Sequence, residues 1–106
     1  MAQFVYDNSR AIEVDDRALA HLQVVIIDKL RRGEHFAVSL SDGTRIAMMW
    51  VGPSTPLQFI YHSSRGERLN RAWIEALATE GGFSGVLALS PEPPPERPER
   101  DRTANP

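Results

Sequence analysis

The segment from Asp15 to Gly33 has the most constraining pattern in the chain, because it carries both ends and the buried face of one helix. Asp15 is a helix-capping residue, and Val14 and Leu19 stand at the two positions of a hydrophobic staple. The apolar positions that follow at helical spacing are Leu19, Leu22, Ile26 and Leu30. Gly33 can adopt the left-handed conformation that ends a helix. We therefore expect one amphipathic helix here.

Short alternating segments surround this helix and predict strands. Residues 3–14 read as a hairpin, residues 35–40 and 44–51 as two strands, and residues 56–62 as a third strand antiparallel to them. Asn70 caps a second helix, which we expect to stop at Gly81 and Gly82, and residues 85–90 form a last strand. The order ββαβββαβ predicts an α+β fold, a mostly antiparallel sheet with two helices on one face.

Length and composition predict one domain followed by a tail. The chain has 106 residues, no cysteine and a formal net charge of −2, which leaves neither disulfide nor thiolate chemistry and no overall attraction to nucleic acid. Residues 92–106 are rich in proline and charged residues and have almost no apolar side chain. We therefore expect a folded domain over residues 1–91 and a disordered tail after it. No apolar stretch is long enough to span a bilayer, and a cytoplasmic location is the simplest expectation.

The sequence "SLSDGT" contains the only pattern that resembles catalytic chemistry. Nucleotidyl transfer of the ligase type needs a lysine nucleophile in a K-x-D-G setting, and Leu40 stands where that lysine would be. Asp42-Gly43 between two apolar runs is instead typical of a two-residue hairpin turn. We therefore assign no catalytic residue. His21, His35 and His62 lack metal-ligand spacing, so neither a metal nor another cofactor is expected.

Basic residues provide the one candidate for phosphate or partner binding. Flexible arginines beside helix-start amides can hold a phosphate or a carboxylate. The candidates are Arg65, Arg68 and Arg71 near the second helix, with Lys29, Arg31 and Arg32 at the end of the first. Acidic neighbours such as Glu67 and Asp28 dilute this charge, and a solvated surface remains the competing interpretation.

Strand alternation also indicates a surface for self-association. We place a large apolar set toward the helices: Phe4, Tyr6, Phe36, Val38, Ile46, Met48, Trp50, Leu57, Phe59 and Tyr61. The opposite face then presents a smaller apolar set, which we assign as a dimer face: Ala47, Met49, Val51 and Ile60. An apolar cluster on a sheet face turned away from the helices is typical of a contact surface.

Three blocks of sequence resemble a known family. "DDRALAHLQVVIIDKLRRGEHF", "LNRAWIEALA" and "GVLALSPEP" are similar to small uncharacterised bacterial proteins that often carry the label "ATP-dependent DNA ligase". The resemblance covers residues 3 to 93. Those relatives have a longer, acidic, lysine-containing loop in place of Ser41-Asp42-Gly43, and His-Pro in place of Gly52-Pro53. A ligase would also need a nucleotidyltransferase domain well above this length.

Two functional hypotheses follow. The first is a non-catalytic binding or assembly module that forms a homodimer. The alternative is a nucleic-acid-binding accessory protein, linked by the family label to DNA ligation or repair and itself without ligase activity. Salt separates the two, because phosphate binding weakens steeply as salt rises and apolar assembly does not.

Overall fold

The computed structural model describes residues 1–63 and 66–95. Its elements follow the predicted order: β1 (Ala2–Tyr6), β2 (Arg10–Val14), α1 (Asp16–Arg31), β3 (Phe36–Ser41), β4 (Ile46–Val51), β5 (Leu57–Ile60), α2 (Arg71–Ser84) and β6 (Val86–Ala88). The α+β class and the order ββαβββαβ are confirmed. No helix among the described residues is long and apolar enough to cross a membrane.

Both helices begin where their capping residues predict. The Asp15 side chain accepts a hydrogen bond from the Ala18 amide, and the Asn70 side chain accepts one from the Ala72 amide. Helix α1 ends before Gly33, which has a φ of 76°. The predicted stop of α2 at Gly81 and Gly82 is wrong, because the helix continues to Ser84 and Gly85 supplies the left-handed cap at φ 78°. The glycine that ends this helix is the one that must turn the chain into β6.

The strands form two three-stranded sheets rather than one. The first has the order β2-β1-β5 and is antiparallel; the second has the order β4-β3-β6, with β3 and β4 antiparallel and β3 and β6 parallel. The expectation that β5 pairs beside β4 is wrong. The five residues after Val51 carry the chain to the other sheet, where the Asp7 amide donates to the Pro56 carbonyl and Tyr6 pairs with Leu57.

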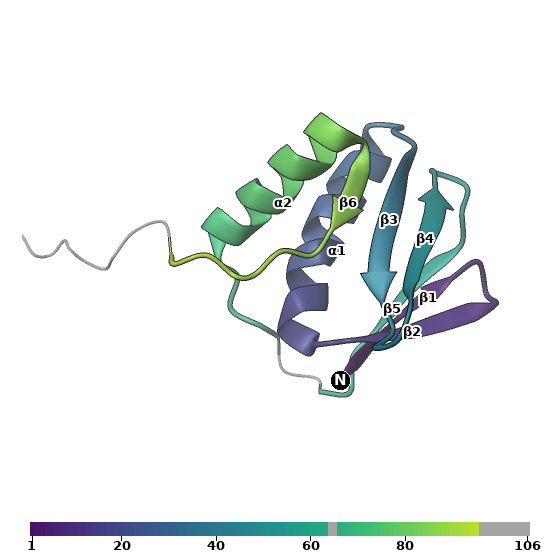
Figure 1. The fold of residues 1–106 in the computed structure, drawn as a ribbon, viewed down its shortest axis with the longest axis horizontal. Coiled ribbons are helices and arrows are strands. Elements are labelled where there is room, and N and C mark those ends of the chain that lie inside the picture. The colour runs from purple at the N-terminus through teal and green to yellow at the C-terminus, as the bar shows by residue number, and fades with distance from the viewer. Residues whose placement is uncertain (64–65, 96–106) are drawn as a thin grey trace, which may run out of the picture.

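The core lies between the helices and the sheets. Helices α1 and α2 lie side by side on one face of the β4-β3-β6 sheet, and β1, β2 and β5 cross at one end of it (Figure 1). Leu19, Leu22 and Ile26 of α1 are fully buried, as the helical spacing predicts. Trp73 and Leu77 of α2 and Leu87 of β6 complete the same cluster. No helix of the described part of the chain covers the other face of the β4-β3-β6 sheet.

Candidate functional site

The basic residues proposed for phosphate binding do not converge. Lys29 is only 6% exposed: its Nζ lies 3.0 Å from Glu34 Oε1 and 5.2 Å from the centre of the Phe36 ring. Arg32 pairs with Asp28 at 2.8 Å and with Glu34 at 3.3 Å. These contacts assign Lys29 and Arg32 to the packing and charge balance at the end of α1. Arg31, in the same turn, is exposed.

The second basic group lies at the opposite ends of the helices. Arg68 and Arg71 are exposed beside the start of α2, and Arg65 lies outside the described residues. The Arg68 carbonyl accepts a hydrogen bond from Arg17 at the start of α1, whereas the Lys29 side chain lies near Gly81 at the end of α2. The two helices therefore run in the same direction, and a helix of 16 residues separates the two basic groups by about 24 Å.

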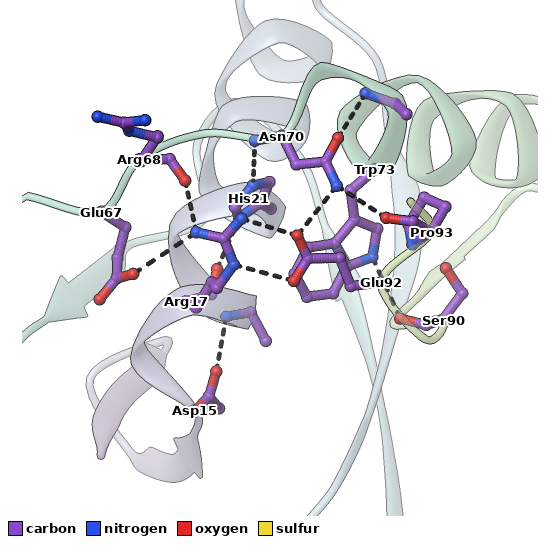
Figure 2. Close-up of polar contacts among 12 residues, drawn as sticks. Asp15, Arg17, His21, Glu67, Arg68, Asn70, Trp73, Ser90, Glu92 and Pro93 are labelled. Atoms are coloured by element: carbon purple, nitrogen blue, oxygen red, sulfur yellow. Dashed lines mark hydrogen bonds and ion pairs between the residues drawn. The ribbon is translucent and has the colours of Figure 1, made fainter. Parts of the chain in front are cut away.

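A polar network joins the starts of both helices to the segment after β6 (Figure 2). His21 is completely buried. Its Nε2 accepts a hydrogen bond from the Asn70 amide at 2.7 Å, and its Nδ1 lies 2.7 Å from the Arg17 carbonyl. An amide can only donate and a carbonyl can only accept, so the imidazole is neutral with its proton on Nδ1. Its ring lies against Trp73, with centroids 4.6 Å apart.

Glu92 is the centre of the charged part of this network. Arg17 donates to both carboxylate oxygens, at 2.9 and 2.7 Å, and Asn70 Nδ2 donates to one of them and to the Pro93 carbonyl, each at 2.9 Å. Hydrogen bonds from Arg17 and then Asn70 lower the pKa of Glu92 to about 2. Trp73 Nε1 donates to the Ser90 carbonyl at 3.1 Å. Glu92 and Pro93, which the composition placed in the tail, are thus bound to the domain.

Both ring nitrogens of His21 have a protein partner, so we interpret this network as structural rather than reactive. We call the network of Arg17, His21, Asn70 and Glu92 the clasp. Sequence reasoning missed it, because its members are widely separated along the chain. The one available signal was a histidine at a position that shares the buried face of α1.

The predicted dimer face is wrong in its residues. Met49 is 4% exposed, Val51 is fully buried, and Ala47 is half-buried against the core. Ile60 is exposed, but it belongs to the other sheet. In β4 the register pairs Val51 with Phe36 and Met49 with Val38, and directly opposed residues share one face of a sheet.

The large apolar residues of β4 therefore point to solvent. Ile46, Met48 and Trp50 are 70%, 59% and 62% exposed. In a hairpin with a two-residue loop, the numbers of two paired residues add up to an odd number. The inward residues of β3 have even numbers, so their partners on β4 must have odd numbers. The two-residue hairpin predicted from the sequence already required odd-numbered residues of β4 to face inward. The loop itself is displaced by one residue, to Gly43-Thr44, since the Asp42 amide donates to the Arg45 carbonyl and Asp42 Oδ1 accepts from the Arg45 amide.

We call the side of the β4-β3-β6 sheet that faces away from the helices the outer face. Two rows of paired residues cross it: Trp50, Ala37 and Val86 in one, and Met48, Ser39 and Ala88 in the next. Ile46 and Ser41 begin a third row. The outer face thus carries large apolar side chains on β4, small side chains on β3 and β6, and no charged residue among these positions.

His35 borders the outer face. Its imidazole stacks on Trp50, with ring centroids 6.4 Å apart and 21° between the planes. The imidazole also occupies the space over Gly52, where a Cβ atom would meet its Cδ2 and lie 2.8 Å from its Nε2. Trp50 is therefore held in place on one side.

A second apolar surface is a groove of about 1070 Å³ along α1 and α2. Its apolar lining includes Ala20, Val24 and Ile27 of α1 and Ile74 and Ala78 of α2. At one end Tyr61 donates its hydroxyl to Gln23 Oε1 at 2.6 Å, and burial raises the pKa of Tyr61 to about 12. In the part of the chain that the structure describes, no cluster of three or more His, Asp or Glu side chains is placed to hold a metal ion.

Comparison with known families places this arrangement in a domain family. Residues 1–92 match the domain of unknown function DUF7882, which covers the folded part of the chain, and the chain belongs to this family. Comparisons with curated proteins and with solved structures found no match.

Proposed function

We propose that this DUF7882 domain is a non-catalytic assembly module that forms a symmetric dimer through the outer face. The observation that carries the proposal is the exposure of Ile46, Met48 and Trp50, each more than half exposed on one strand. Exposed apolar clusters of this kind mark interaction surfaces. Tryptophan and methionine are also enriched at the centres of protein interfaces, where charged residues are depleted.

The shape of the outer face favours a second copy as the partner. Its large side chains stand on β4 at one edge of the sheet, and the small side chains of Ala37, Ser39 and Ala88 lie beside them. A two-fold axis parallel to this face and running along its strands sets the β4 side chains of each copy on the small residues of the other. One self-complementary surface is sufficient for such a contact.

The alternative, a nucleic-acid-binding accessory protein, is supported by less of the geometry. Arg68 and Arg71 are exposed, but Arg17 beside them already binds Glu92, with Glu67 3.8 Å away. Lys29 and Arg32 have acidic partners at the far end of α1. The link to DNA ligation, which comes from the family label, stays a prediction.

Analytical ultracentrifugation tests the proposed dimer. We expect the wild type to sediment as a dimer at micromolar concentration and Met48→Lys to sediment as a folded monomer, because each interface would bury two unpaired charges. Ile27→Lys is the matched control: Ile27 is 41% exposed, but it lies on α1 on the other side of the sheet. A wild type that stays monomeric at hundreds of micromolar, or a dimer broken by Ile27→Lys and not by Met48→Lys, overturns the proposal.

A further inference from the structure

Strand β4 has an unpaired outer edge. Among the residues that the structure describes, it lies at the end of its sheet and pairs only with β3. Hydrogen-bonded and non-bonded pairs alternate in an antiparallel ladder. The Asp42 amide bonds to the Arg45 carbonyl, so the pairs of Ile46, Met48 and Trp50 with β3 are the non-bonded ones. The Trp50 carbonyl agrees with this, since it points outward to accept from the Tyr6 hydroxyl at 2.9 Å.

A hollow of about 530 Å³ lies along this edge. One wall is the edge itself, from Arg45 to Met49, and the opposite wall is the end of the β1–β2 hairpin, with Tyr6, Ser9 and Arg10. Between them the amides and carbonyls of Ile46 and Met48 face open space. A strand edge of three residues is about 10 Å long. Because the hairpin stands opposite this edge, we expect an extended segment to fit beside β4 more readily than the edge of a second whole domain.

The end of the hollow nearest the β3–β4 turn is positively charged. Arg10 and Arg45 both pair with Asp42, at 3.6 and 3.4 Å, and their side chains remain 44% and 74% exposed. Hydrogen bonds from the Arg45 and Thr44 amides lower the pKa of Asp42 to about 2, so it stays ionised. Two guanidinium groups share this one carboxylate, which leaves one positive charge for a ligand. Arginine is well suited to bind a further carboxylate.

We propose that β4 binds an extended peptide segment of another protein, which adds as a strand in this hollow and places an acidic side chain or carboxylate at Arg10 and Arg45. Ile46 and Met48 each offer one amide and one carbonyl, which gives four main-chain hydrogen bonds to two peptide residues spaced by two. The added strand stops at Trp50, whose carbonyl is already bonded to Tyr6. This surface is separate from the proposed dimer face, which uses side chains of the same strand.

Hydrogen exchange measured by NMR tests this proposal. The probe is a blocked tetrapeptide of β-branched residues that ends in a glutamate, and its control is the same peptide with a lysine in that place. We expect the glutamate peptide to slow exchange of the Ile46 and Met48 amides, whereas those of Ala47 and Met49 are already protected by β3. The variant Arg10→Glu/Arg45→Glu should weaken binding about tenfold or more, and Arg31→Glu, which reverses a distant charge on α1, should not.

The possible results separate this proposal from the dimer. Unchanged exchange at Ile46 and Met48, or equal protection by the lysine peptide, overturns strand addition while leaving the sedimentation result standing. A third result also overturns it: exchange of the Ile46 and Met48 amides that is already slow without peptide and slows further as the protein concentration rises. A second copy of the chain would then occupy the edge. Protection in a Met48→Lys monomer supports strand addition whatever the dimer does.

Discussion

The backbone amide of Asn70 donates a 2.7 Å hydrogen bond to Nε2 of His21, which joins the cap of α2 to the buried face of α1 across 49 positions of sequence. The opposite ring nitrogen bonds to the Arg17 carbonyl. The side chain therefore gives the buried Asn70 amide its partner and adds a second hydrogen bond to the Arg17 carbonyl, which in the α-helical pattern also accepts from the amide four residues later. Its removal has a cost beyond the lost packing.

We expect His21→Phe to lower the free energy of unfolding by about 1–3 kcal/mol, because the ring volume is kept while the buried Asn70 amide loses its partner. Urea denaturation followed by circular dichroism measures this loss. His62→Phe, at an exposed position, is the control and should stay close to the wild type. A His21→Phe variant as stable as the wild type would contradict this role, because it would show that water satisfies the Asn70 amide.

Glu92 gives the domain a stability that depends on acid pH. Its pKa in the folded state lies near 2, below its ordinary value of 4.5, so the contact with Arg17 and Asn70 contributes fully above pH 4.5 and is lost as pH falls toward 2. We expect Glu92→Gln to be less stable than the wild type at neutral pH, with the difference disappearing across that range. Denaturation curves at several pH values measure it, with Glu75→Gln on α2 as control. A difference that stays constant down to pH 2 would contradict the assignment.

Two neighbouring methionines test the register of β4. We expect Met49→Lys to be largely unfolded, because Met49 is 4% exposed opposite Val38 and a lysine there would bury an unpaired charge. Met48→Lys should stay folded, since Met48 is 59% exposed. Circular dichroism and one-dimensional NMR separate the two results. If Met49→Lys folds stably and Met48→Lys is unfolded, the two faces of β4 are the reverse of those described.

The arginines near the start of α2 predict only weak binding to nucleic acid. We expect immobilised DNA to retain the domain only at low salt. About three phosphate contacts give limited affinity at physiological salt. Replacing Arg65, Arg68 and Arg71 together by alanine should abolish that retention without loss of helical circular dichroism. Retention that survives physiological salt, or that the triple change leaves intact, would contradict this expectation.

Local rules predicted the elements well, because their signals lie within a few residues of one another. Asp15 and Asn70 cap the two helices as expected, and Gly33 ends the first. The end of α2 was missed because Gly81 serves a different purpose. A Cβ there would lie 3.2 Å from Leu87 Cδ1 and 3.4 Å from Lys29 Cε, so the glycine allows α1, α2 and β6 to pack closely.

Strand pairing and strand faces were harder to predict because they depend on distant partners. Nothing in the residues after Gly52 indicates that β5 crosses to β1 instead of staying beside β4. The face of β4 was misassigned because the largest apolar side chains were placed in the core, whereas the pairing of Phe36 with Val51 decides the matter. The clasp around Glu92 was missed for the same reason, since its members come from both helices and the segment after β6.

The imidazole of His35 over Gly52 restricts the order in which this chain can change during evolution. While His35 stacks on Trp50, any side chain at position 52 collides with its ring. Position 35 must therefore mutate first, or the imidazole must move away from the indole, before position 52 can accept another amino acid. Family members with a side chain at position 52 are therefore expected to lack either the imidazole at position 35 or its stacking on the indole, so the two positions are expected to vary together.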